Sequence, residues 1–485
     1  MGEPARIQSK KAPVYLDVDG TFLRTDLLLE AIWAGLGTAP LQTLSACWHH
    51  WKEPAALKAA LADTVDLRLD LMPVNEEVAA LADAARAEGH EVGLASASPE
   101  VWVARLAEAK GLTGPTLGSD ATTNLRGERK AEALVAAHGS GGFIYAGDTR
   151  ADEAVWREAQ AAIVVGRASG AAKRMEASGI PVTKVASGWA ARDLLRAMRP
   201  HQWVKNVLLL LPMIAAHEFG LITLGMALLG MAAFSAAASA IYIVNDLLDL
   251  EADRLHVKKR KRPFASGAVP IHVGAVTSLV LIATALGVGA ALGPAFLGVV
   301  AVYMVLSLAY SLKLKRMRWV DIATLASLYT LRVVAGAAAT GVDASTMMLI
   351  FIFPVFISLG CVKRLTELTL ATSDERLPGR GYGRPDRGDL LNMAALGVVG
   401  ALLIFFLYSF SPQALMLYPT RWILWLAMLP LAIWLVRMVV LDYGGKQDYD
   451  PIVFAMSDKM GIGILLITLS MMFYAAGLWA EWFGF

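Results

Sequence analysis

The chain has 485 residues, a formal net charge of +2 and 56% hydrophobic residues, so it is too long for one ordinary domain. Its balanced charge gives no sign of a nucleic-acid partner, and its two distant cysteines, Cys47 and Cys361, argue against a disulfide framework or a zinc site. Residues before about 196 have the composition of a soluble protein, whereas apolar runs long enough to cross a bilayer recur from about 204 onward. These features predict a soluble domain at 1–190, a connecting helix at 191–203 and a membrane domain at 204–485.

The soluble part alternates short β-type runs with Ala-rich helical stretches. The runs PVYLDVDG, HEVGLASAS, FIYAGD and AAIVVG are typical of strands bounded by Gly, Ser or Asp. Strands that alternate with helices predict a parallel sheet in a Rossmann-like α/β fold. The long helical segment at about 27–85, between the first two strands, is expected to form a cap over the C-terminal edge of that sheet.

The first candidate site is the pair Asp17 and Asp19 at the end of the first strand. Residues two apart on a strand share a face, so we expect the two carboxylates to point together. Carboxylates so close repel each other unless a cation lies between them, and Mg²⁺ prefers oxygen ligands. The alternative interpretation of DVDGT is an ordinary surface turn.

Three further motifs, in order along the chain, extend this site. Ser96 ends the second strand, Lys130 begins a helix, and Asp148 and Asp152 follow a third strand. With DVDGT, these motifs resemble the haloacid dehalogenase (HAD) superfamily over residues 12–190. The resemblance implies Mg²⁺-dependent phosphoryl transfer to water, with Asp17 as nucleophile and Asp19 as general acid and base. It also implies phosphoryl binding by Ser96 and Lys130, and one Mg²⁺ held by Asp17, Asp19, Asp148 and Asp152. A folded but inactive regulatory or scaffold module is the alternative.

The membrane part is predicted to contain nine spans and to be all-α and polytopic. They lie near 204–222, 224–246, 272–291, 294–312, 320–340, 346–366, 392–411, 421–440 and 461–481. Basic residues gather after the even-numbered spans, so the positive-inside rule places those loops and the soluble domain in the cytoplasm. We therefore expect an inner-membrane protein with both sites on the cytoplasmic side and the C-terminus on the far side.

Two further loops face the same predicted side. The Gly- and Arg-rich loop 372–389, which contains Asp374 and Glu375, is interpreted as a lid, with a plain linker as the alternative. The loop 442–459 brings Asp448, Asp450 and Asp458 to that side as supporting residues.

The second candidate site lies at the end of the second span, in the run NDLLDLEAD. Asp246, Asp249 and Asp253 are spaced i, i+3, i+7 and so fall on one helix face, directly after Asn245 and an apolar run. Acidic residues at the end of a membrane span are costly and are functional by default. Three acids beside a basic loop suit a divalent cation that holds a diphosphate. A solvated helix end is the alternative.

This run resembles the first signature, N-D-x-x-D-x-x-x-D, of the UbiA superfamily of membrane transferases. Most relatives carry a second signature, D-x-x-x-D, where this chain has KRLTEL with Lys363, Arg364 and Glu367. A second metal cluster is therefore not expected, and basic side chains are expected to bind phosphate there.

The presence of KRLTEL in place of the second acidic signature points to one branch of the superfamily. RPHQWVKN, the H-x-x-K-x-x-R-P stretch, YSLKLK and KRLTEL resemble decaprenyl-phosphate phosphoribosyltransferases over residues 195–485, although Val257 stands where that branch has proline. The branch implies transfer of 5-phosphoribosyl from phosphoribosyl diphosphate (PRPP) to a polyprenyl phosphate, with one Mg²⁺ on Asp246, Asp249 and Asp253. The implied substrate-binding residues are Lys205, Asn245, Lys259, Arg262, Tyr310, Lys315, Lys363, Arg364 and Glu367. The rest of the basic run 258–262 suits anionic membrane lipids.

The hypothesis that unites the two parts is that the soluble domain removes the 5-phosphate from the membrane product. The alternatives are an aromatic prenyltransferase that uses a prenyl diphosphate, and a soluble domain that only recruits partners. The sequence is compatible with an oligomer.

Overall fold

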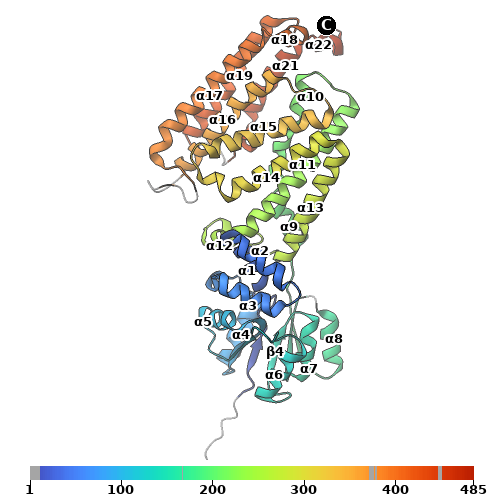
Figure 1. The fold of residues 1–485 in the computed structure, drawn as a ribbon, viewed down its shortest axis with the longest axis vertical. Helices are drawn as coiled ribbons and strands as arrows, with labels where there is room; N and C mark the ends of the chain where they lie inside the picture. The colour runs from blue at the N-terminus through green and yellow to red at the C-terminus, as the bar shows by residue number, and fades with distance from the viewer. Residues whose placement is uncertain (1–10, 167, 371–375, 377–379, 446–449, 485) are drawn as a thin grey trace, which may run out of the picture. The chain divides into compact units, whose positions relative to one another are not determined.

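The computed structural model describes residues 11–166, 168–370, 376, 380–445 and 450–484 (Figure 1). Asp374, Glu375 and Asp448 of the two loops above lie outside the described residues. The chain divides into two compact units. Unit 1 comprises Met1–Met198 and Tyr242–Thr277, and unit 2 comprises Arg199–Ile241 and Ser278–Phe485. The acidic run at 245–253 therefore belongs to the same unit as the soluble domain.

Unit 1 contains a parallel sheet, which confirms the predicted α/β class. Its strands are β1 (Val14–Leu16), β2 (Val92–Pro99), β3 (Thr116–Ser119), β4 (Ile144–Gly147), β5 (Ala161–Val165) and β6 (Val182–Val185). Their order is β3-β2-β1-β4-β5-β6, and every pairing is parallel. The register aligns Leu16 of β1 with Leu94 and Ala146 on the two neighbouring strands. The residues that follow these strands therefore meet at one edge of the sheet.

Helices cover both faces of this sheet (Figure 1). Val14 and Leu16 pack in a core with α4 (Glu76–Ala87) and α5 (Glu100–Ala109). The intervening Tyr15 packs in a second core with residues of α6 (Glu128–His138), α7 (Glu153–Glu158) and α8 (Ser169–Ala177). A sheet buried on both faces explains why its central strands β1 and β4, and the next strand β5, are almost continuously apolar.

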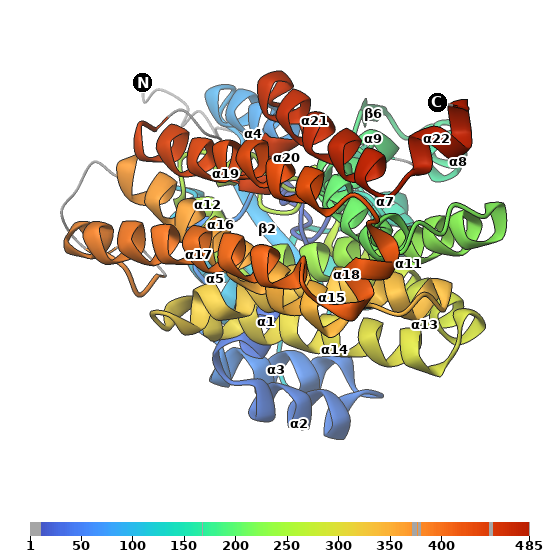
Figure 2. The ribbon, with the colours of Figure 1, turned by 90° about the horizontal axis from the view of Figure 1, so that it is seen from above.

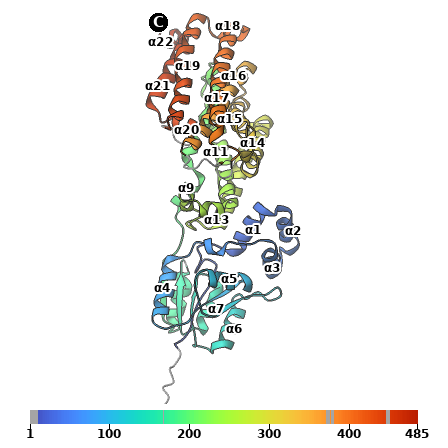
Figure 3. The same ribbon diagram turned by 90° about the vertical axis from the view of Figure 1, so that its left-hand side faces the viewer.

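The predicted cap segment forms α1 (Leu27–Thr38), α2 (Pro40–His50), α3 (Pro54–Thr64) and the short 3-10 helix η1 (Leu69–Leu71). Figure 3 shows α1, α2 and α3 grouped together. Asp26 caps α1 by accepting a hydrogen bond from the backbone N of Leu29, which fixes where that helix begins. The last helix of the 27–85 segment, α4, packs on the sheet instead, because Val78 and Ala82 join the core of that face.

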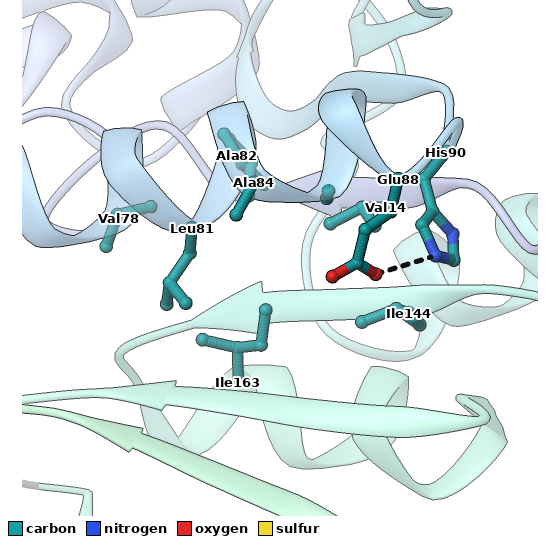
Figure 4. Close-up of a pocket in the computed structure, with 11 residues that line it drawn as sticks. Val14, Val78, Leu81, Ala82, Ala84, Glu88, His90, Ile144 and Ile163 are labelled. Atoms are coloured by element: carbon teal, nitrogen blue, oxygen red, sulfur yellow. Dashed lines mark ion pairs between the residues drawn. The ribbon is translucent and has the colours of Figure 1, made fainter.

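A small pocket of about 200 Å³ lies between α4 and strands β1, β4 and β5 (Figure 4). Its lining is almost entirely apolar, with Val14, Leu81 and Ile163 on its walls. The His90 Nε2 atom lies 3.9 Å from the Glu88 Oε2 atom at its rim. This lining offers no chemistry for the predicted phosphate site, which lies elsewhere on the sheet.

The membrane part is helical. Its longer helices are α11 (Leu221–Leu248), α13 (Ile271–Leu292), α14 (Pro294–Leu312), α15 (Val320–Thr340), α16 (Thr346–Thr369), α17 (Arg387–Tyr408), α19 (Arg421–Tyr443) and α21 (Lys459–Ala475). Within unit 2, α16 packs along α17, and α19 along α21 (Figure 2).

In the described part of the chain, seven helices are long and apolar enough to cross a membrane, not the nine that we predicted. The first predicted span is divided into a 3-10 helix, η3 (Pro200–Leu210), and the five-residue α10 (Leu211–Ala215). His217 follows with a φ of 60°, a backbone conformation that ends a helix. The ninth predicted span is α21, which has 17 residues. The other seven predicted spans correspond to these long helices.

Candidate active sites

The first site is a carboxylate cluster at the C-terminal ends of β1 and β4. Asp17 directly follows β1, and its backbone N donates to the carbonyl oxygen of Ala146 at 2.9 Å. Oxygen atoms of Asp17, Asp148 and Asp152 all lie within 4.8 Å of one another. The Lys130 Nζ atom donates to Asp17 Oδ1 at 2.8 Å. The parallel sheet thus brings together four of the residues that the sequence singled out.

Asp152 is held rigidly in this cluster. Its Oδ2 atom accepts hydrogen bonds from the backbone N and the hydroxyl of Thr149, at 3.0 and 2.7 Å. Its Oδ1 atom accepts from the hydroxyl of Tyr145 at 3.0 Å, and that hydroxyl lies 2.6 Å from Lys130 Nζ. Tyr145 was missed from the sequence, where it is an ordinary strand residue with no motif around it.

The electrostatics of the cluster favour a bound cation. Burial raises the pKa of Asp17 to about 8 and that of Asp148 to about 7, because each carboxylate loses water and neighbours other acids. One lysine does not neutralise three acids. Several carboxylate oxygens within 4.8 Å suit a hard divalent cation, so the residues present fit the predicted Mg²⁺.

Asp19 lies outside this three-carboxylate cluster. Its Oδ1 atom accepts from the backbone N of Leu27 at 2.8 Å, and its Oδ2 atom accepts from the hydroxyl of Ser98 at 2.8 Å. The strand ends at Leu16 and the chain turns at Gly20, which has a φ of 79°, so strand alternation does not align Asp17 with Asp19. The three-carboxylate group in the described residues does not include Asp19, so its place among the metal ligands stays a prediction. Burial raises the pKa of Asp19 to about 6, a value suited to an acid and base.

The two serines of LASASP have different places. Ser96 is fully buried, and its hydroxyl oxygen accepts from the backbone N of Ser98 at 3.0 Å. Ser96 does not line the pocket that contains the carboxylates, whereas Ala97 does. The serine that contacts an acidic residue of this site is therefore Ser98, and phosphoryl binding by Ser96 stays a prediction.

The pocket around the cluster has a volume of about 670 Å³. The cap contributes Leu28, Pro54 and Lys58 to its lining, and the segment after the acidic run contributes Gly267, Pro270, Ile271 and His272. Arg24 and Arg126 also line it, and neither side chain makes a hydrogen bond or ion pair with the described part of the chain. The pocket therefore offers two arginine side chains in addition to Lys130.

The second site lies at the end of α11. This helix ends at Leu248, Asp249 has non-helical angles, and α12 (Leu250–Leu255) then begins, so the predicted single helix face is interrupted. Asp246 and Asp253 are nevertheless brought together, because Arg262 Nη1 lies 3.1 Å from Asp246 Oδ1 and 2.7 Å from Asp253 Oδ2. Both acids are almost fully buried. The Oδ1 atom of Asn245 is buried without a hydrogen-bond partner among the described residues, so the run keeps an acceptor that fits a cation or a substrate donor.

A buried ion pair joins this acidic run to the cap within unit 1. Arg254 of α12 contacts Glu30 of α1 through Nη2–Oε1 at 2.5 Å and Nη1–Oε2 at 3.1 Å. The Thr25 hydroxyl donates to the same carboxylate at 2.6 Å, and Arg254 Nε donates to the carbonyl oxygen of Ala265 at 3.1 Å. α1 also begins at Leu27, whose N–H binds Asp19. Helix α1 therefore contacts the first site through the hydrogen bond from Leu27 to Asp19, and the helix after the acidic run through the ion pair between Glu30 and Arg254.

Unit 2 contains most of the other predicted phosphate-binding residues, and four of them, with the predicted Lys205, lie in two groups: Lys205 with Lys363, and Arg364 with Tyr310 and Glu367. Lys205 and Lys363 share one acid, because Lys205 forms an ion pair with Asp450 and Lys363 Nζ lies 3.5 Å from Asp450 Oδ2. Asp450 belongs to the loop that we expected to supply supporting residues.

The second group surrounds Arg364, which is fully buried. It contacts both carboxylate oxygens of Asp321 at 2.5 and 2.8 Å, Glu367 at 2.5 Å and the Tyr310 hydroxyl at 2.7 Å. The Nε and Nη2 atoms thus make hydrogen bonds to Asp321 and Tyr310, whereas Nη1 makes only an ion pair with Glu367, so Arg364 holds these neighbours in position. Sequence reasoning missed Asp321. The remaining predicted residues, Lys259 and Lys315, lie on the short 3-10 helices η4 (Lys259–Lys261) and η5 (Leu314–Arg316).

Comparison with known proteins shows which family this chain resembles. Residues 206–457, more than half of the chain, match the model of the UbiA prenyltransferase family. An uncharacterized protein, y4nM, of Sinorhizobium fredii is 33% identical over 96% of this chain and 91% of its own length. The decaprenyl-phosphate phosphoribosyltransferase of Mycobacterium tuberculosis is 32% identical over 55% of this chain and 88% of its own length. A solved UbiA homolog from Archaeoglobus fulgidus, bound to GPP and Mg²⁺, aligns with a TM-score of 0.43 at 17% identity, over 59% of this chain and 99% of that one.

The seven long apolar helices and the family match together make this a multi-pass membrane enzyme. The alignment with y4nM spans both the parallel-sheet domain and the membrane helices, so the joining of these two parts is shared with that relative. The chain belongs to the UbiA prenyltransferase family.

Proposed function

We propose that the membrane domain transfers 5-phosphoribosyl from PRPP to a polyprenyl phosphate, and that the parallel-sheet domain then removes the 5-phosphate from the product. The first half is supported by the relative named decaprenyl-phosphate phosphoribosyltransferase, of which this chain covers 88% at 32% identity. The observation that carries it is Lys363, which shares Asp450 with Lys205 and belongs to the run KRLTEL. Paired lysines suit phosphate groups, whereas a second acidic cluster would suit a second metal.

In the transferase reaction, the bond between ribose C1 and the diphosphate breaks, and a bond from C1 to an oxygen of the lipid phosphate forms. Asp246, Asp249 and Asp253 would hold Mg²⁺, which neutralises charge on the departing diphosphate when bound. Arg262 lies between two of these acids and can turn from them to a substrate phosphate. Arg364 keeps Tyr310 and Glu367 in fixed positions. No covalent bond to the protein is needed.

In the phosphatase reaction, which resembles that of the HAD superfamily, a carboxylate oxygen of Asp17 attacks the phosphorus atom. Asp19 gives its proton to the departing sugar oxygen, and later takes a proton from the water that hydrolyses the aspartyl phosphate. Asp17, Asp148 and Asp152 would hold a cation that neutralises the phosphoryl group when bound. Lys130 binds a phosphoryl oxygen, and Asp152 keeps that lysine in place through Tyr145.

The pocket supports a substrate larger than a simple phosphate ester. A volume of about 670 Å³ is in the range of sites for sizeable ligands. Arg24 and Arg126 add two cations to the lining of this pocket, and their side chains have no hydrogen-bond or ion-pair partner among the described residues. A polyprenyl-phospho-ribose 5-phosphate carries a phosphodiester as well as the 5-phosphate, and so supplies the second anionic group that these arginines suit.

The test of the first reaction uses the purified full chain in nanodiscs with Mg²⁺. One arm supplies PRPP and a polyprenyl phosphate, and the other supplies a prenyl diphosphate and a phenolic acid. We expect a lipid-linked ribose only in the first arm, and its loss in Asp246→Asn. A prenylated phenol in the second arm, with no PRPP-dependent lipid in the first, would establish the aromatic prenyltransferase instead.

A further inference from the structure

The cap of the soluble domain exposes a stripe of large apolar side chains along α2 and its C-cap residue, Trp51. Leu41, Leu44, Trp48 and Trp51 are 81%, 56%, 81% and 72% exposed. At about 100° per residue, their spacing of three, four and three residues places them within about 80° of the helix circumference. Thr43, on the other side of α2, is fully buried. The helix is therefore amphipathic, with its apolar side directed away from the domain.

This stripe lies beside the end of a membrane-spanning helix. A methyl group built on Gly37, near the end of α1, would lie 3.7 Å from the carbonyl oxygen of Leu248, the last residue of α11. α2 begins only three residues after Gly37. The buried ion pair between Glu30 and Arg254 fixes α1 to α12, immediately beyond the same end of α11. These contacts all lie within unit 1, so α2 is held at the level where that span leaves the bilayer.

The chemistry around the stripe is that of a membrane surface. Tryptophan is enriched at the boundary between hydrocarbon and water, where its ring is partly apolar and its N–H is hydrated. Lys52 follows the stripe, with its Nζ atom 4.8 Å from the centre of the Trp51 ring. The segment after α12 exposes Leu255 and Val257, at 58% and 75%, directly before the exposed basic run 258–261. Basic residues beside apolar ones suit anionic lipid headgroups.

We propose that α2 is an interfacial anchor, whose Leu41, Leu44, Trp48 and Trp51 side chains insert into the headgroup region of the bilayer that the membrane helices cross. A protein partner is disfavoured by size, because a stable interface buries roughly 800 Å² on each side and four side chains of one short helix offer less. A bilayer sets no such minimum, since each inserted apolar side chain contributes by itself.

The anchor has a consequence for the phosphatase site, which rests on the proposed function. The neighbouring cap helices α1 and α3 supply Leu28, Pro54 and Lys58 to the 670 Å³ pocket. A cap anchored in the headgroup region holds this pocket where the ribose of a lipid-linked substrate lies. Soluble phosphate esters do not need the anchor.

The test measures the depth of α2 in the full chain, whether or not either reaction is observed. A background without native cysteines, Cys47→Ser with Cys361→Ala, receives a bimane-labelled cysteine at Trp48 or Leu44. Val101→Cys is the matched control, because Val101 is a 63% exposed apolar residue at the start of α5. Each protein is placed in nanodiscs with anionic lipids, and bimane is quenched either by spin-labelled lipid or by aqueous iodide.

We expect spin-labelled lipid to quench the labels at positions 44 and 48, and iodide to quench them at least about threefold less than the label at 101, because the headgroup region excludes the ion. Equal iodide quenching at 48 and 101, with no quenching by lipid, would overturn the proposal. Protection from iodide that persists in detergent and grows with protein concentration would assign the stripe to a second copy, and would also overturn it.

Unlabelled Trp48→Glu/Trp51→Glu protein separates this proposal from the proposed function. If the anchor and the phosphatase function are both correct, the variant releases phosphate from ribose 5-phosphate as the wild type does. It acts at least about tenfold more slowly on the lipid-linked substrate, because the loss of anchoring lowers the effective concentration of that substrate at the phosphatase site. A wild type that hydrolyses neither substrate refutes the phosphatase function and leaves the quenching result to decide the anchor.

Discussion

The ion pair between Glu30 and Arg254 makes a quantitative prediction about how the cap is held. Their side chains are only 3% and 6% exposed, two nitrogen–oxygen contacts join them, and Thr25 donates to the same carboxylate. Replacing Arg254 with alanine leaves a buried, uncompensated carboxylate, which costs about 3–5 kcal/mol. The cost falls on α1 and α12, because these are the two helices that the pair joins.

Hydrogen–deuterium exchange of the full chain in nanodiscs measures this cost locally. We expect the amides of α1 in Arg254→Ala to exchange roughly 10²- to 10⁴-fold faster than in the wild type, as a loss of about 3–5 kcal/mol in opening free energy requires. The double variant Glu30→Leu/Arg254→Met should recover most of the protection, because it leaves no charge unpaired. Arg105→Ala is the control, since it breaks an exposed pair with Asp66 in the same unit. Unchanged α1 protection in Arg254→Ala would refute the reasoning.

Three further outcomes test the phosphatase site. Burial raises the pKa of Asp17 to about 8 and that of Asp148 to about 7, so the metal-free domain has their full contribution to stability below about pH 4 and loses it as the pH rises toward 8. Mg²⁺ should therefore raise the unfolding temperature of the wild type more at pH 8 than at pH 6. In Asp148→Asn, Mg²⁺ should not raise the unfolding temperature. Ser98→Ala removes a hydrogen bond to the Asp19 carboxylate, so the acidic limb of the pH–rate profile should move to higher pH, and an unmoved limb would contradict the role given to Ser98. Arg24→Ala should lower kcat/KM about 10-fold or more for the lipid-linked phosphate but not for p-nitrophenyl phosphate, and equal losses on both would exclude a second anion contact.

The first site was largely predictable because its residues are placed by the sheet. Asp17 and Asp148 directly follow paired parallel strands, so their proximity comes from strand order and not from any long loop. The place of Asp19 outside the three-carboxylate cluster was not predictable in this way, since the alternation of side chains assumes a strand that continues past Leu16. Tyr145 could not be found, because nothing in a strand sequence distinguishes a hydroxyl that contacts Lys130 from one that faces solvent.

The membrane part was predictable in its helices and less so in its contacts. Hydropathy finds long apolar runs, but it does not detect that Pro200–Leu210 forms a 3-10 helix or that the backbone turns at His217. The partner of Arg364 was missed because Asp321 lies 43 residues away on another helix. Only packing between helices reveals that this arginine is neutralised by acids.

The central claim is that the two parts of the chain act in sequence on one lipid. The most direct measurement incubates the full chain in nanodiscs with PRPP, polyprenyl phosphate and Mg²⁺, and identifies the lipid products by mass. The wild type is expected to make lipid-linked ribose without the 5-phosphate, whereas Asp17→Asn is expected to accumulate the 5-phosphorylated lipid at an unchanged total yield. An unchanged dephosphorylated fraction in Asp17→Asn, or no PRPP-dependent lipid in either protein, would contradict the account.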